Sequence, residues 1–220
     1  MRRTPALPDR SRRRLMRGAM ALGGARLLGA SLDVLAAPGS ARATPRMTAG
    51  PFYPRSLPAD RDADLVQVSG RTETAAGLIL HVAGRVVDTR GRPLAGARIE
   101  LWQANTHGRY THPDDDSPAP LDPNFQGYGV LVTGTDGGYR VRTVKPGPYS
   151  SRTPHLHFAI SGGGARLVTQ MFFEGERANE ADFLYRGLGR EERLAVTARV
   201  ADRAPEPSAL SVSWDIVLAG

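Results

Sequence analysis

The chain of 220 residues contains no cysteine. Disulfide bonds, thiolate metal ligands and cysteine nucleophiles are therefore excluded. The H-E-x-x-H and H-x-x-E-H patterns of common zinc hydrolases are also missing. No apolar run is suited to a membrane-spanning helix, because the longest weakly apolar stretch, residues 18–37, includes Arg26 and Asp33. We therefore expect no permanent membrane anchor and no hydrolase of those zinc classes.

Positive charge is concentrated at the N-terminal end of the chain. The formal net charge is +7, and residues 1–46 hold ten arginines against two aspartates. This segment accounts for the whole basic excess, so the remaining residues are close to neutral. A basic face for nucleic acid is therefore not expected on the folded part. With 40% hydrophobic and 23% charged residues, the composition is typical of a globular protein.

The first 46 residues have the layout of an export signal. Arginines 12–14 precede the weakly apolar stretch 18–37, and the small-x-small pattern ARA follows at 41–43. This order is typical of a twin-arginine signal with a cleavage site. We predict export to the periplasm or the extracellular space, and a disordered basic tail is the alternative.

The rest of the chain predicts an extended arm at 47–75 and one β-sandwich domain at 76–220. The arm is rich in proline and charge, whereas the domain alternates short β-type segments with Gly/Pro turns. Strands are predicted at 78–87, 96–104, 139–144, 155–160, 167–173, 194–201 and 212–218. A short helix is expected within 180–190. The predicted fold class is mainly β, an antiparallel β-sandwich.

His155 and His157 are the first residues that suggest chemistry. On a strand, residues i and i+2 face the same side, so both imidazoles can reach one metal ion. Two such histidines are, however, more often packed or hydrogen-bonded than metal-bound. No carboxylate lies close in sequence, which disfavours the two-histidine-one-carboxylate Fe(II) site and the cupin pattern. Proline-stiffened loop residues instead bring Tyr149 and Arg152 near the pair. A phenolate is a hard anionic donor, which favours Fe(III).

Six stretches of the chain, in this order, resemble intradiol ring-cleavage dioxygenases, most closely the protocatechuate 3,4-dioxygenase branch. They are TAGPFYP (48–54), LWQANTHGRY (101–110), APLDPNF (119–125), TVKPGPY (143–149), RTPHLHF (152–158) and TQMFFEG (169–175). The resemblance covers residues 47–220 and implies a transthyretin-like sandwich topology. It also implies a ferric ion, Fe(III), with the ligands Tyr110, Tyr149, His155 and His157.

The resemblance further implies the reaction and two pocket residues. Arg152 would lie over the substrate ring, Gln170 would line the same pocket, and Tyr149 would accept a substrate proton. A catechol-type substrate would react with O2 and open between its two hydroxyl-bearing carbons, giving a muconate-type diacid. Ser151 stands where the family has an aromatic residue, and the loop before the histidines is short. These departures leave the identity of the catechol open, as they do the choice between a homo-oligomer and a pairing with a related subunit.

A second interpretation comes from the turn that begins at Val86 (VVDTRGRPLAGA), which resembles transthyretin-like and carboxypeptidase-regulatory β-sandwiches. Such domains are often binding or spacer modules. The alternative function is therefore an exported, non-catalytic binding module with a degenerate metal site. The tyrosine–histidine quartet together with Arg152 separates the two interpretations, since a spacer does not need it.

Overall fold

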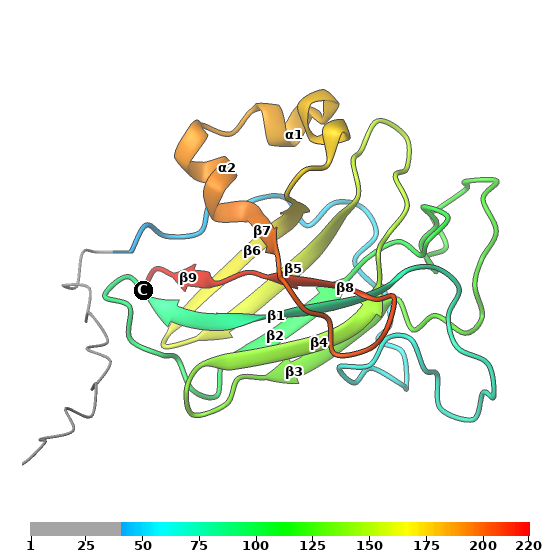
Figure 1. Ribbon diagram of the computed structural model, residues 1–220, viewed down its shortest axis with the longest axis horizontal. Coiled ribbons are helices and arrows are strands. Elements are labelled where there is room, and N and C mark those ends of the chain that lie inside the picture. The colour runs from blue at the N-terminus through cyan, green and yellow to red at the C-terminus, as the bar shows by residue number, and fades with distance from the viewer. Residues whose placement is uncertain (1–40) are drawn as a thin grey trace, which may run out of the picture. The chain divides into compact units, whose positions relative to one another are not determined.

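The computed structural model describes residues 41–220 (Figure 1). Within this range the predicted fold class is confirmed: nine strands and few helices form the described part. The strands are β1 (Ile79–Asp88), β2 (Arg98–Trp102), β3 (Tyr128–Val132), β4 (Gly138–Val144), β5 (His155–Gly162), β6 (Ala165–Phe173), β7 (Thr197–Val200), β8 (Leu210–Ser213) and β9 (Ile216–Leu218). The helices are η1 (Arg177–Ala181), α1 (Phe183–Arg186) and α2 (Arg190–Val196). None of the helices in residues 41–220 has the length and apolar character needed to cross a membrane.

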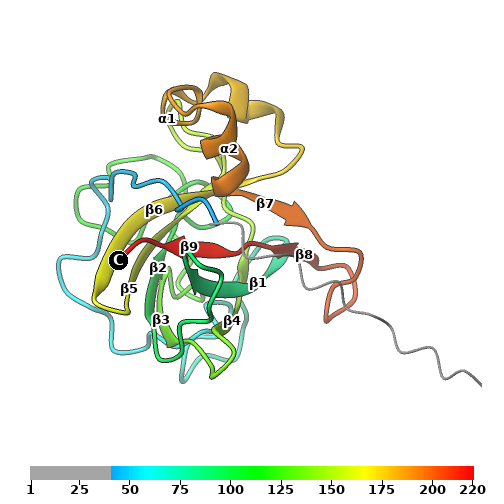
Figure 2. The ribbon, with the colours of Figure 1, turned by 90° about the vertical axis from the view of Figure 1, so that its left-hand side faces the viewer.

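The strands form two layers that are joined through β7. One layer has the order β3-β2-β5-β6, and the other contains β4, β1 and β8, with β9 beside β1. Strand β7 pairs in parallel with β6 and antiparallel with β8 and so connects the two layers. Figure 2 shows β7 leaving the β5–β6 layer toward β8. Strand β1 also pairs in parallel with β8 and β9. The sandwich is thus mainly antiparallel but not purely so.

The hydrophobic core lies between the two layers. Alternate residues of β5, namely Leu156, Phe158 and Ile160, are fully buried in it. Strands β1 and β4 contribute Val82 and Val141 from the facing layer. The strict alternation in the sequence of β4 was therefore a reliable signal, because one face of this strand lies in the core.

Two predicted strands differ from the structure. Residues 194–196 belong to α2 and not to a strand, because the helix begins after Gly189, whose N–H is bonded by Glu192 at 2.8 Å. The predicted strand 212–218 is interrupted at Trp214, whose carbonyl accepts a hydrogen bond from Tyr139 at 2.7 Å. Strand β3 was not predicted. The expected short helix at 180–190 is α1, preceded by η1.

The N-terminal arm contacts the sandwich from residue 41 onward, so contacts begin before the predicted boundary at residue 47. Thr44 is buried and exchanges two hydrogen bonds with Val217. Met47 donates to Val168 on β6, and Thr169 donates to Pro45. The segment, drawn in blue in Figure 1, therefore lies beside β6. The predicted signal peptide itself, apart from residues 41–46, falls outside the described residues.

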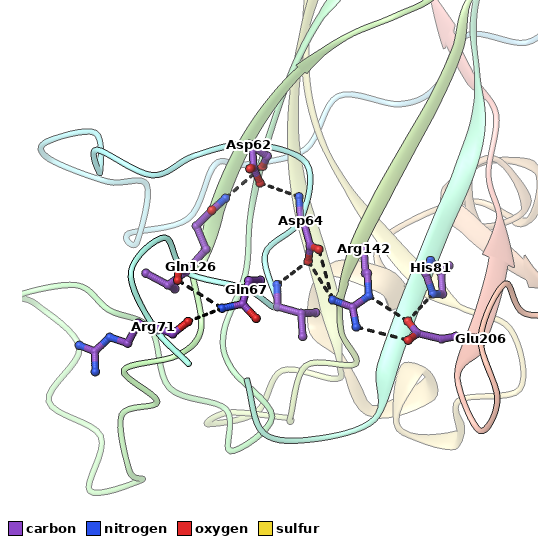
Figure 3. Close-up of polar contacts among 10 residues, drawn as sticks. Asp62, Asp64, Gln67, Arg71, His81, Gln126, Arg142 and Glu206 are labelled. Carbon is purple, nitrogen blue, oxygen red and sulfur yellow. Dashed lines mark hydrogen bonds and ion pairs between the residues drawn. The ribbon is translucent and has the colours of Figure 1, made fainter. Parts of the chain in front are cut away.

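A polar network fixes the second half of the arm (Figure 3). Arg142 on β4 pairs with Asp64 of the arm at 3.2 Å and with Glu206 of the β7–β8 loop at 2.9 Å. His81 on β1 contacts the same Glu206 carboxylate at 2.8 Å. The arm and the β7–β8 loop are thus both held against strands β1 and β4.

Candidate metal centre and active site

The two histidines of β5 lie on the face of the strand that is turned away from the sandwich core. Leu156 and Phe158 fill the core, so His155 and His157 project from the opposite side. Both are nonetheless buried, with 2% and 1% of their surface exposed. The arm covers this side closely, because a Cβ on Gly50 would lie only 3.2 Å from Cε1 of His157. A buried polar layer therefore forms between the outer face of β5 and the arm.

The register of the neighbouring strands determines what surrounds the histidines. Trp102 on β2 and Gln170 on β6 are both paired with His157, and Phe172 on β6 is paired with His155. The Trp102 ring stacks on His157 with centroids 5.0 Å apart, and Phe172 stacks on His155 at 5.9 Å. These flat contacts fix the orientation of both imidazole rings.

Hydrogen bonding assigns the tautomer of His155. Its Nδ1 lies 2.6 Å from the carbonyl oxygen of Thr153, which can only accept, so Nδ1 carries the proton and Nε2 has a free lone pair. This Nε2 lies 3.1 Å from Nε2 of His157. Burial, assisted by the charge of Arg152, lowers the pKa of His155 to about 4. Burial and the nearby His155 lower the pKa of His157 well below its ordinary value. Both rings are therefore neutral nitrogen donors at neutral pH.

Tyr110 is held in the loop after β2. Asp115 accepts a hydrogen bond from the Tyr110 backbone N–H at 2.6 Å, and Asn105 accepts from the N–H of Arg109 at 3.0 Å. Gly108 has φ +77°, and a Cβ there would lie 2.2 Å from the carbonyl oxygen of Pro148. This glycine lets the Tyr110 loop pack directly against the loop that carries the second tyrosine.

Tyr149 begins a tight turn that ends at Arg152. The backbones of these two residues exchange hydrogen bonds of 3.3 and 2.8 Å, and Ser150 between them has φ +48°. The turn directs the Tyr149 hydroxyl to 3.3 Å from Nε2 of His155. The Tyr110 and Tyr149 rings meet edge to face with centroids 5.3 Å apart. All four predicted ligands therefore lie around one point.

This donor set fits a ferric ion. Two ligand atoms at about 2.1 Å from one metal and at right angles to each other lie about 3 Å apart, which is the spacing of the two imidazole Nε2 atoms. Among residues 41–220 the buried Tyr110 hydroxyl has no hydrogen-bond partner, and burial raises the pKa of this phenol well above 10. A bound cation would satisfy this oxygen as a phenolate. Within residues 41–220 no cluster of three His, Cys, Asp or Glu side chains offers a competing metal site.

Arg152 and Gln170, the two predicted pocket residues, contact each other. The Arg152 Nη2 donates to Gln170 Oε1 at 2.6 Å, and its Nε donates to Asp182 at 2.8 Å. Asp182 is fully buried and also accepts from the N–H of Thr153 at 3.1 Å. Gln170 in turn donates to the carbonyl of Thr48 in the arm at 2.9 Å. The guanidinium plane is thus fixed on two sides.

A cavity of about 840 Å³ opens onto Tyr149 and Arg152. Its walls come from four segments: the arm, the loop after β2, the Tyr149 turn and helix α1. The lining residues include Pro51, Phe52, Asp115, Asp116, Phe183 and Leu184. The arrangement can bind a flat aromatic molecule beside a buried cation.

Several site residues were not identified from sequence. Asp182 and Trp102 act through contacts between segments, which a single sequence does not show. An N-cap signal was available for Asp182, since its carboxylate accepts from the N–H groups of Leu184 and Tyr185 at the start of α1. His107 is exposed and lines the cavity. The side chain of His112 is buried beside Phe52.

Comparison with known proteins gives consistent matches. A family model described as "Dioxygenase" matches residues 48–220. The protocatechuate 3,4-dioxygenase beta chain of Burkholderia cepacia is 39% identical over 169 residues, which cover 72% of each chain. The catechol 1,2-dioxygenase of Acinetobacter baylyi is 34% identical over 173 residues, covering 68% of this chain and 52% of that protein. The chain therefore spans only about half the length of the second relative.

A solved structure gives a match over nearly all of its length. The dioxygenase domain of a dioxygenase–carbohydrate-binding protein fusion from Streptomyces sp. SirexAA-E has a TM-score of 0.63 and 29% identity. The match covers 81% of this chain and 99% of that domain. The described sandwich is thus comparable in extent to that isolated domain.

Proposed function

This chain belongs to the intradiol ring-cleavage dioxygenase family, and we propose that it holds Fe(III) through Tyr110, Tyr149, His155 and His157. The proposed reaction joins a catechol-type substrate with O2, opens the ring between its two hydroxyl-bearing carbons and gives a muconate-type diacid. The observation that carries the proposal is the convergence of two tyrosine oxygens and two neutral imidazoles in a buried layer next to a cavity.

When bound, the ferric ion acts as a Lewis acid that favours the doubly deprotonated catechol. The residues of the chain supply the remaining functions. Burial raises the pKa of the Tyr149 phenol above its ordinary value. A phenolate at this position is therefore a strong base, and a catechol hydroxyl beside it transfers its proton to the Tyr149 oxygen.

Arg152 stabilises the negative charge that this proton loss leaves on the ring. An arginine guanidinium is a planar cation, so it can lie along an aromatic face. Asp182 and Gln170 hold it in place with bonds of 2.8 and 2.6 Å. The position is set before the substrate binds, which avoids an ordering cost during the reaction.

Product analysis tests the proposed function. The full-length chain is loaded with Fe(III) and given catechol in buffer equilibrated with ¹⁸O2. We expect one O2 consumed per catechol and two labelled oxygen atoms in a ring-opened diacid. Tyr149→Phe is expected to reduce kcat by at least a hundredfold, since it removes both a ligand and the proton acceptor. Absence of O2 uptake, or a ring opened beside rather than between the hydroxyl-bearing carbons, would contradict the proposal and favour the binding-module alternative.

We also propose that the chain is exported by the twin-arginine route, supported by the arginines at 12–14 and the ARA pattern at 41–43. Export of an already folded protein suits a domain that must first acquire its metal. Replacing the three arginines by lysines should retain the precursor in the cytoplasm, whereas the unaltered chain should be found outside it in a shortened form. If the lysine variant and the unaltered chain were divided equally between the cytoplasm and the outside, the export proposal would be contradicted.

A further inference from the structure

The cavity next to the metal centre is larger than a single catechol ring requires. Its volume of about 840 Å³ lies in the range of pockets that hold drug-sized ligands. The ring itself is expected at Tyr149 and Arg152, at the inner end. The outer part of the cavity therefore remains available for a substituent on the ring.

The outer part has an apolar wall on each side. Pro51 and Phe52 of the arm form one wall, and Phe183 with Leu184 at the start of α1 forms another. Phe183 has 61% of its surface exposed, although it is a large hydrophobic residue. Its ring lies 5.6 Å from the guanidinium carbon of Arg152, so it borders the position expected for the substrate. An apolar substituent placed there would remove Phe183 from water.

The charges that line the cavity disfavour an anionic substituent. The exposed Asp116 supplies a carboxylate that makes no ion pair among residues 41–220. Asp115 also lines the cavity, but it is buried and its two oxygens accept hydrogen bonds from the backbone N–H groups of Tyr110 and Ser117. The guanidinium of Arg152 already pairs with Asp182 at 2.8 Å. Apart from His107, an imidazole at the rim, no other lining residue can carry positive charge. A carboxylate that reaches the outer part of the cavity would thus meet the like charge of Asp116, because Arg152 is held at the inner end by Asp182.

We propose that this chain prefers neutral catechols with an apolar ring substituent over catechols that carry a carboxylate, and that Phe183 and Asp116 determine this preference. The inference rests on the proposed function, whose substrate class it narrows. It differs from what the name of the protocatechuate 3,4-dioxygenase relative suggests, since protocatechuate carries a carboxylate.

Two measurements on the full-length chain test the preference. The first compares kcat/KM for catechol, 4-tert-butylcatechol and protocatechuate on the iron-loaded protein. The second measures the affinities of the metal-free protein for the last two by calorimetry. We expect both kcat/KM and affinity to be at least tenfold lower for protocatechuate than for 4-tert-butylcatechol. High salt should reduce this difference in affinity, since it screens the repulsion between the two carboxylates.

Two variants assign the preference to residues. Phe183→Ala should lower the ratio of kcat/KM for 4-tert-butylcatechol to kcat/KM for catechol about fivefold. The matched control Leu194→Ala, an equally exposed residue on α2 outside the cavity, should leave the ratio unchanged. Asp116→Asn should raise kcat/KM for protocatechuate, relative to that for 4-tert-butylcatechol, at least threefold. The control Asp202→Asn should leave this ratio unchanged.

The outcomes separate this inference from the proposed function. Cleavage of catechol with protocatechuate equal to or better than 4-tert-butylcatechol would overturn the preference and leave the proposed function standing. Tighter binding of the neutral catechol without cleavage of any substrate would support the preference and overturn the proposed function. Equal affinities and no cleavage would overturn both.

Discussion

Replacing Asp182 by asparagine tests how the substrate-facing arginine is held. One carboxylate oxygen of this fully buried residue accepts from Arg152 and Thr153, and the other caps α1. An asparagine can keep the cap with its single oxygen, but its amide group then faces two donors. Arg152 remains as a buried cation, 9% exposed, without its partner.

The expected cost is about 3 kcal/mol of the free energy of unfolding. A hydrogen bond to a charged group is worth about 1.5–3 kcal/mol, and removing one partner of a buried ion pair costs about 3–5 kcal/mol. The lower end applies because Gln170 still contacts Arg152 at 2.6 Å. The value is measured from urea denaturation of the metal-free protein at pH 7, with exposed Asp202→Asn as the control, expected within about 0.5 kcal/mol of the unaltered protein. A loss below about 1 kcal/mol for Asp182→Asn would refute this account of the pair.

Three further predictions concern pH, the arm and the Tyr149 turn. Burial alone would raise the pKa of Asp182, but hydrogen bonds from Arg152 and backbone N–H groups lower it below its ordinary value. The ionised Asp182 thus stabilises the fold fully above about pH 3.9, and this contribution is lost as pH falls through the lower pKa of the folded state. The free energy of unfolding, measured against pH in acid, should show this loss for the unaltered protein and not for Asp182→Asn. Tyr53→Phe removes the bond from the arm to Glu100 and should cost about 1 kcal/mol and speed amide exchange in residues 48–52; unchanged exchange would contradict the anchoring role. Ser150→Gly should raise stability by about 0.5–1 kcal/mol, because φ is +48°, whereas Ser151→Gly should not.

The sequence predicted strands where their signals are local. Alternation identified β4 because one face of this strand lies in the core. The prediction of Tyr110 and Tyr149 as ligands came from family motifs and not from spacing, since the two residues lie on separate loops. Their close approach depends on Gly108 packing against Pro148, which the sequence alone does not indicate.

Other features depend on long-range contacts and could not be predicted. The pairing of Trp102 with His157 requires the register between β2 and β5. The strand β3 has only five residues and begins after an irregular loop, so its pattern is short. The parallel pairing of β7 with β6 follows from the helices that separate them in sequence, because α2 returns the chain to the edge of the same layer.

The visible spectrum of the ferric protein tests the central claim most directly. If Tyr110 and Tyr149 bind Fe(III) as phenolates, the iron-loaded protein should be coloured by a tyrosinate-to-iron charge-transfer band. This band should shift when a catechol is added without oxygen, and it should vanish in the Tyr110→Phe/Tyr149→Phe double variant. A colourless protein after reconstitution, or a band that survives in the double variant, would contradict the iron–tyrosinate assignment.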